Sequence, residues 1–174
     1  MQKTIYSFFV WSLWISHSLT TQAQTTVLSL QDLAPLAGQW YGSLTYLDYT
    51  SNQAYTMPAD VQIKLVDSPP QLLVAYAYPN EPKANGTDTL LLSADGRMLD
   101  NEVVVGLAVT SEGEKTIITE VKGKDGNDDK PGILRHIYTF GATQFSIQKG
   151  VLFDGETQWI KRHTYSFARS KSDK

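Results

Sequence analysis

Apolar and polar residues alternate in short runs from Trp40 to Ala168, and turn-forming residues separate the runs. In the run 60–66, for example, Val61, Ile63 and Leu65 fall on one side and polar residues on the other. A period of two is typical of a β-strand with one buried face, and no stretch sustains the 3.6-residue period of a helix. The chain is therefore predicted to be all-β.

The alternating runs predict about ten short strands joined by tight turns. They cover residues 40–49, 60–66, 71–78, 88–92, 97–99, 102–110, 115–122, 133–140, 144–151 and 159–168. Because no connection holds a crossover helix, sequential antiparallel pairing is the simplest topology. We expect this up-and-down meander to close into a barrel of about 8–10 strands, since closure removes both exposed edges. A two-sheet sandwich is the competing architecture.

Residues 1–23 have the features of an export signal. Lys3 supplies a positive start, the run 5–15 is largely apolar, and small residues precede an expected cleavage site after Ala23. The run is too short to span a bilayer, which takes about 20 residues. We expect a secreted or periplasmic protein with no membrane span after signal removal; an N-terminal membrane anchor is the alternative.

The remaining chain is predicted to form one domain. Residues 24–37 form an N-terminal segment with a short helical turn, because Ser29 and Asp32 have capping-box spacing and Pro35 limits the turn. Residues 38–169 form the barrel, and residues 170–174 a flexible tail.

Composition excludes several classes of function. The chain has no cysteine, which excludes disulfide scaffolds, thiol nucleophiles, cysteine zinc sites and iron–sulfur clusters. A formal charge of −3 argues against a nucleic-acid partner, which usually needs a basic face. Nucleophile elbows, phosphate-binding loops and dinucleotide glycines are also missing from the sequence, so we predict a protein that is not an enzyme and has no cofactor or metal.

The segment 33–42, which reads LAPLAGQWYG, resembles the opening of a lipocalin. Lipocalins and the wider calycin group begin with a helical turn and then Gly-x-Trp, here Gly38 and Trp40. Nitrobindin-like haem barrels open in a similar way, so the resemblance implies a calycin-like barrel and does not choose a family within it. The Thr-Asp-Tyr motif of lipocalins is missing. The resemblance implies that Trp40 plugs the closed end of the barrel above Gly38, with an arginine of the last strand packed on its ring. Arg162 is preferred over Arg169 because it lies inside the expected strand.

The leading functional hypothesis is a barrel that binds a small apolar or amphipathic molecule in its interior. The residues expected to line the site are Leu44, Tyr46, Val61, Ile63, Leu65, Leu73, Tyr76, Tyr138 and His163. A second hypothesis is a filled barrel that serves as a structural or surface-interaction module of the cell envelope. A third is a haem-binding protein or an isomerase-type enzyme built on the same barrel.

His136 and His163 lie on separate strands that a closed barrel could bring together. If haem is bound, His163 is the expected ligand; otherwise both are ordinary hydrogen-bonded or surface histidines. Glu120 is a candidate partner for either histidine in acid–base chemistry.

Two local patterns remain. Arg162 and Tyr165 differ in parity, so only a β-bulge would let both point inward, as in the carboxylate-binding Arg and Tyr of fatty-acid-binding proteins. The segment 125–129, DGNDD, has the spacing of a calcium loop, but no glutamate follows where one is needed. We interpret it as a long acidic hairpin loop.

Overall fold

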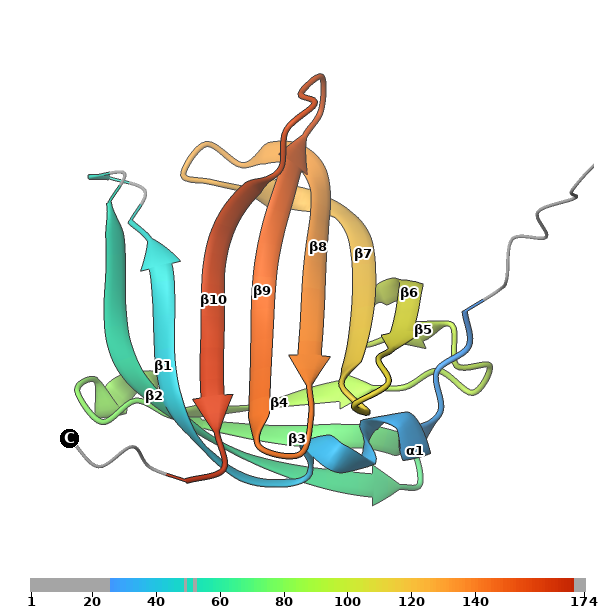
Figure 1. Cartoon of the computed structure of the whole chain (residues 1–174). Helices are drawn as coiled ribbons and strands as arrows, with labels where there is room; N and C mark the ends of the chain where they lie inside the picture. The colour runs from blue at the N-terminus through green and yellow to red at the C-terminus, as the bar shows by residue number, and fades with distance from the viewer. Residues whose placement is uncertain (1–25, 49, 52, 171–174) are drawn as a thin grey trace, which may run out of the picture.

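The computed structural model describes residues 26–48, 50–51 and 53–170, so the expected signal and most of the expected tail lie outside it. Ten strands form one antiparallel sheet in the order β4-β3-β2-β1-β10-β9-β8-β7-β6-β5. Apart from β4 and β5, which stand at the two edges of the sheet, each strand pairs with its neighbours in sequence, and the first and last strands, β1 and β10, pair with each other (Figure 1). The predicted all-β meander is confirmed.

The strands follow the alternating runs closely. They are β1 (Gly38–Leu47), β2 (Ala54–Asp67), β3 (Pro70–Ala77), β4 (Gly86–Leu91), β5 (Met98–Leu99), β6 (Glu102–Val109), β7 (Lys115–Asp125), β8 (Lys130–Phe140), β9 (Gln144–Phe153) and β10 (Ile160–Ala168). The largest difference is at β2, which begins six residues before the expected strand. Pro58 pairs with Ser43 of β1 and lies beyond Asp60, where the pairing of β2 with β3 ends, so β2 is paired on one side only at this proline.

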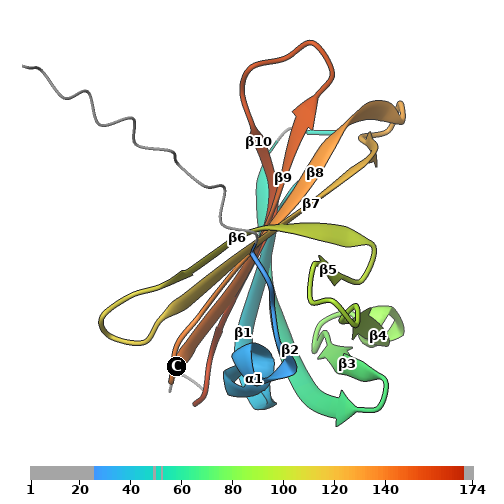
Figure 2. The same cartoon turned by 90° about the vertical axis from the view of Figure 1, so that its right-hand side faces the viewer.

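The sheet curls into a nearly closed barrel, which rules out the sandwich. Its outer strands meet through a single bridge between Leu92 and Leu99, on the side where Figure 2 shows β4 and β5 together. The Asp100 N–H donates to the Leu91 carbonyl at 2.6 Å, and the Ser93 N–H donates to the Met98 carbonyl at 3.0 Å. These few bonds make the β4–β5 seam the shortest pairing of the barrel.

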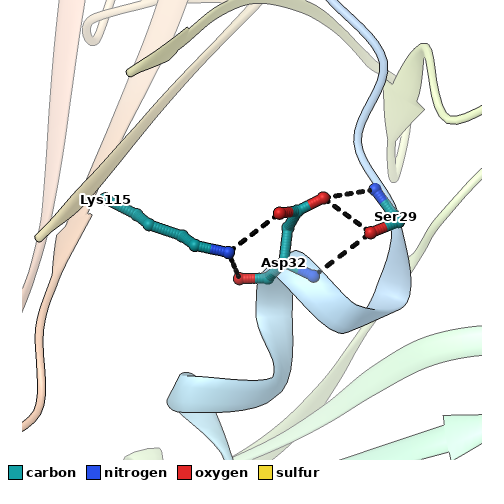
Figure 3. A network of polar contacts seen from close by, with 3 residues as sticks. All are labelled: Ser29, Asp32 and Lys115. Atoms are coloured by element: carbon teal, nitrogen blue, oxygen red, sulfur yellow. Dashed lines mark hydrogen bonds and ion pairs between the residues drawn. The ribbon is translucent and has the colours of Figure 1, made fainter. Parts of the chain in front are cut away.

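A short helix lies at the lower end of the barrel in Figure 1. It consists of α1 (Leu30–Leu33) followed by the 3₁₀ turn η1 (Ala34–Leu36), as the sequence predicted. Ser29 and Asp32 form a reciprocal capping box, and the Lys115 ammonium of β7 donates to Asp32 at 2.8 Å (Figure 3). These contacts fix the helix against the barrel. Leu33 of the helix and Leu36 of the 3₁₀ turn are both buried.

The end of the barrel beside the helix is packed with aromatic side chains. Trp40 is fully buried and donates its indole N–H to the Leu36 carbonyl at 2.8 Å. Phe145 lies 5.6 Å from the Trp40 ring and 5.5 Å from Phe167, measured between ring centroids. The side chains at this end leave a void of about 10 Å³, which is too small for more than one water molecule. This end of the barrel is therefore filled.

Alternation decides which residues enter the core. Val61 and Ile63 are buried on β2, as expected. On β3, Leu72 and Val74 are buried, whereas Leu73 between them is only partly covered and pairs with Lys64 on the outer side of β2. The expectation that Leu73 lines the interior is wrong, because it has the opposite parity to the buried positions of β3.

Gly42 permits the close approach of β1 and β10. A β-carbon at this position would lie 1.9 Å from the Ser166 carbonyl oxygen, so any side chain would force the two strands apart. Among the described residues, no helix is both long enough and apolar enough to cross a membrane.

Candidate functional site

Three tyrosines form a layer directly above the filled aromatic end. Tyr76, Tyr138 and Tyr165 come from β3, β8 and β10, and the Tyr76 and Tyr165 rings lie 5.3 Å apart. The Tyr165 hydroxyl also forms a 2.7 Å hydrogen bond with the Tyr78 hydroxyl. Burial raises the pKa of all three phenols of the layer, so they stay neutral. The layer presents apolar rings with hydroxyl groups that can hydrogen-bond.

Above the tyrosines, four polar residues face one another across four consecutive strands. His163 of β10 pairs with Lys149 of β9, Lys149 with His136 of β8, and His136 with Thr119 of β7. We call these four residues the polar row. Thr119, Lys149 and His136 each lie two residues along the strand from a buried core position, and His163 lies two residues from Tyr165, which packs against the core, so the row faces the interior of the barrel.

Glu102 of β6 holds His136 in one orientation. The His136 Nδ1 lies 2.8 Å from Glu102 Oε1 and 2.9 Å from Oε2, and the Thr119 hydroxyl donates to the same carboxylate. Burial alone raises the pKa of Glu102, but hydrogen bonds from His136 and Thr119 outweigh it, and the pKa falls below its ordinary value. The carboxylate is therefore ionised and accepts a hydrogen bond from Nδ1 of His136. Nε2 is the ring nitrogen of His136 that Glu102 does not contact.

His163 has a different environment. Burial, together with the positive charges of His136 and Lys149, lowers its pKa to about 4, although Asp125 opposes this. Its contacts are with rings: the His136 centroid is 6.3 Å away and the Tyr165 centroid 5.6 Å away. Among the described residues no protein hydrogen bond to its ring nitrogens is found, and neither nitrogen is a buried polar atom without a partner. His163 is thus a neutral imidazole that can donate to or accept from a bound molecule.

Arg162 is the extra residue of a β-bulge. The register of β10 against β9 shifts between Lys161 and His163, so Arg162 has no direct partner on β9. This bulge resolves the parity conflict seen in the sequence: Arg162 is mostly buried, while Tyr165 still faces the core. Arg162 and Tyr165 can therefore both lie inside the barrel, as the sequence allowed only with a β-bulge.

Asp125 joins the upper ends of three strands. Its carboxylate accepts from the Lys149 ammonium at 2.7 Å and from Arg162 Nε at 2.6 Å. These contacts join β7 to β9 and β10, although β8 and β9 separate β7 from β10 in the sheet. The segment 125–129 does form a hairpin turn, as predicted, but Asp125 is 7% exposed and ion-paired. Its carboxylate is a structural anion rather than part of an exposed acidic loop.

The predicted role of Arg162 at the closed end is wrong. Arg169, just after β10, places its guanidinium carbon 3.6 Å from the centroid of Trp40. It also donates to the Ala37 carbonyl at 2.8 Å and to the Pro35 carbonyl at 2.6 Å. Gly38 makes room for it, since a β-carbon there would lie 2.6 Å from the guanidinium. Arg162 is at the other end of β10 and cannot reach Trp40.

The other expected lining residues divide between the two halves of the barrel. Val61, Ile63 and Tyr138 belong to the packed core, and Leu44, Leu65 and Tyr76 pack against it. Tyr46 is near the open end, where its ring lies 5.5 Å from that of Tyr55. Only His163 among the expected residues belongs to the polar row.

Glu120 does not join the histidines. It faces the outer side of β7 and is ion-paired with Arg135, which also lies 3.7 Å from the centroid of Trp159. Sequence reasoning missed Glu102, Lys149 and Thr119. Lys149 and Thr119 share the parity of buried residues on their own strands, which is a signal that could have found them. Glu102 follows a turn, and nothing in its neighbourhood in sequence marks it.

An open hollow of about 780 Å³ also lies beside β1, β2 and β10. Outward residues such as Tyr41, Ser43 and Asp60 line it, and it holds none of the polar row. Among the described residues, no group of three or more histidine, aspartate or glutamate side chains could hold a metal ion. The polar row thus lies inside the barrel, apart from this hollow.

The class defined by these observations is a nearly closed, ten-stranded antiparallel barrel with a filled end and a polar row in its interior. No family model matches the sequence, and neither does any curated protein.

Among solved structures, the fold is similar to that of Rv2717c from M. tuberculosis, at a TM-score of 0.54 and 14% identity over 83% of this chain and 99% of that one. A protein of unknown function from the DUF3598 family of Nostoc punctiforme aligns at a TM-score of 0.42 and 13% identity, over 88% of this chain and 54% of that one. The first similarity supports the barrel fold.

Proposed function

We propose that this chain is a calycin-like binding protein that takes up a small amphipathic molecule in the half of its barrel above the tyrosine layer. The observation that carries the proposal is His163, a neutral imidazole inside the barrel whose nitrogens have no protein partner among the described residues. A neutral imidazole in this position can donate a hydrogen bond to a ligand or accept one from it.

The division of the interior limits where the ligand binds. The helix end is filled, so Val61, Ile63 and Tyr138 serve as a floor rather than as contacts deep in a cavity. The polar row supplies hydrogen-bonding groups above that floor, and Leu44 with the Tyr46 and Tyr55 rings supplies apolar surface toward the open end. An amphipathic molecule suits this combination better than a wholly apolar one.

Native mass spectrometry of the protein purified from its own host tests the proposal. We expect the wild type to carry a bound small molecule that is retained in Leu73→Ala, which changes the outer face, and lost in His163→Leu. Bare protein in all three samples, with no rise in melting temperature after incubation with a total lipid extract, would contradict the proposal. It would favour the filled barrel that works through its surface.

A second candidate is haem binding through His163. A neutral imidazole without a hydrogen bond is free to bind iron, and a pKa of about 4 keeps it unprotonated at mildly acidic pH. Haem would supply redox or gas-binding chemistry, and His163 would hold the iron. Titration with haemin should then give a Soret band that is lost in His163→Ala and retained in His136→Gln, because Glu102 already engages His136. An unchanged band in His163→Ala would refute this assignment.

Export is part of the same proposal. We infer that residues 1–23 direct the chain to the periplasm or the medium and are removed after Ala23. N-terminal sequencing of the protein from its own host should give Gln24 as the first residue, whereas Met1 would indicate a retained anchor.

A further inference from the structure

We propose that the open hollow beside β1, β2 and β10 binds a neutral sugar on the outside of the barrel. This inference goes beyond the proposed function, because the hollow contains none of the polar row and its residues face outward. It comes from the size of the hollow, from the pairing of the strands that form its floor, and from the uncharged hydrogen-bonding groups that surround one carboxylate.

The hollow has the size of a small-molecule site. Its volume is about 780 Å³, and such sites usually measure about 300–1,000 Å³. Figure 1 shows β1 and β2 curving together beside β10. Part of the floor is backbone, because β1 and β10 approach each other closely at Gly42, where no side chain separates them. Paired strands therefore shape the floor and hold the groups around it in place.

Two neighbouring rows of paired residues line the hollow. In the first row Tyr41 of β1 pairs with Asp60 of β2, and in the second Ser43 of β1 lies between Pro58 of β2 and Ser166 of β10. Tyr41 and Ser43 are two residues apart on one strand, so they lie on the same face of the sheet. An aromatic ring and a proline are thus placed beside a carboxylate and two hydroxyl groups.

This lining suits a neutral molecule that carries many hydroxyl groups. Among the described residues that line the hollow, Asp60 is the only charged side chain, so an anion would find no cation there. The hydroxyls of Ser43 and Ser166 and the amide of Gln144 can each donate and accept, as the hydroxyls of a sugar require. The rings of Tyr41 and Pro58 offer apolar surface to the C–H face of a sugar ring.

Asp60 is the group that we expect to bind the sugar most strongly. Its carboxylate accepts the Gly42 N–H at 3.3 Å, and among the described residues it has no ion pair. A carboxylate can accept about four hydrogen bonds, so Asp60 has room for two neighbouring hydroxyl groups of a sugar. Hydrogen bonds to a charged acceptor are stronger than those between neutral groups.

A titration followed by nuclear magnetic resonance tests this inference. Glucose, galactose and mannose are added in turn to the isotope-labelled mature chain (residues 24–174). We expect at least one of them to shift the backbone amide signals of Gly42, Ser43 and Ser166, while the signal of Asp67, which lies outside the hollow at the end of β2, stays in place. The corresponding uronic acid should bind at least tenfold more weakly, because its carboxylate would meet Asp60 without a cation nearby.

Two substitutions identify the groups that bind the sugar. Asp60→Asn keeps an acceptor for the Gly42 N–H but loses the charge, so it should weaken binding of the neutral sugar about tenfold and remove the preference over the uronic acid. Equal weakening of both ligands would mean that Asp60 acts only through the structure and would contradict its assignment. Asp67→Asn, an exposed carboxylate of the same strand, is the matched control and should change neither affinity. Ser166→Trp alters an exposed residue, and its indole should fill the hollow and abolish the shifts even if Asp60→Asn does not fold.

Four results would overturn the inference. They are the absence of shifts with all three sugars, shifts confined to residues of the barrel interior, full binding by Ser166→Trp, and binding of glucosamine more than tenfold tighter than that of any of the three, which would indicate a site for amines. None of these results bears on the proposed function, because that function depends on the interior of the barrel and native mass spectrometry tests it separately.

Discussion

Replacing Arg169 with methionine should destabilise the protein through the closed end of the barrel. The guanidinium contributes a cation–π contact with Trp40 at 3.6 Å and hydrogen bonds to the carbonyls of Ala37 and Pro35. A partly exposed cation–π contact is worth about 0.5–2 kcal/mol, and a hydrogen bond from a charged donor about 1.5–3 kcal/mol. Because methionine keeps part of the packing and water can reach the freed carbonyls, we expect a loss of about 2–4 kcal/mol.

Urea unfolding at neutral pH, followed by tryptophan fluorescence, measures this loss directly. Arg97→Met is the matched control, since Arg97 is exposed on a turn and should change stability by less than about 0.5 kcal/mol. Arg169→Lys should recover only part of the stability, because an ammonium cannot stack on the indole and reach both carbonyls in the same way. If Arg169→Met unfolds at the same urea concentration as the control, the assignment of Arg169 as the residue that closes the barrel is wrong.

Three further predictions concern the core, the seam between β1 and β10, and the polar row. Phe145→Ala should cost about 3–5 kcal/mol in urea unfolding because its ring packs among three other aromatic rings, whereas Leu73→Ala on the outer face should cost about 1 kcal/mol or less. Gly42→Ala should fail to give the native near-ultraviolet circular dichroism, because its β-carbon would meet the β10 backbone, while Gly141→Ala meets nothing within 4 Å and should retain it. Because the folded-state pKa of His163 is lowered to about 4, the unfolded chain binds its proton first and stability falls as pH drops from about 6.5 toward 4. His163→Phe should therefore lose less stability than the wild type between pH 7 and pH 5, by about 2 kcal/mol; parallel losses would show that His163 does not cause the pH dependence.

The fold could be predicted because its signals are local. Alternation and turn residues mark each strand without knowledge of its partner, and the capping box at Ser29 marks the helix. Parity misleads where several apolar residues are adjacent, as in the segment 72–74, where both faces of β3 look hydrophobic. Leu73 was placed inward for that reason.

The site could not be predicted to the same extent because it depends on register and on a bulge. Sequence alternation cannot show that Lys149 lies opposite both histidines, since that depends on how three strands pair. Nor does it show the extra residue at Arg162, which turns two residues of opposite parity toward the interior. In the sequence Asp125 is only part of an acidic run, because its ion pairs reach residues of β9 and β10 that lie far from it along the chain.

The interior changes in character from one end of the barrel to the other, and the order of the change supports binding over a purely structural role. Packed aromatic rings at the helix end give the chain its stability, and the tyrosines above them remain apolar with hydroxyl tips. A barrel that only needed to be stable would continue that packing upward, since replacing buried ion pairs by apolar residues often stabilises a protein. The polar row and the ion pairs of Asp125 instead occupy the next level, with a neutral imidazole at its edge. Charged groups kept in that position at a cost to stability are what the proposed binding site would require.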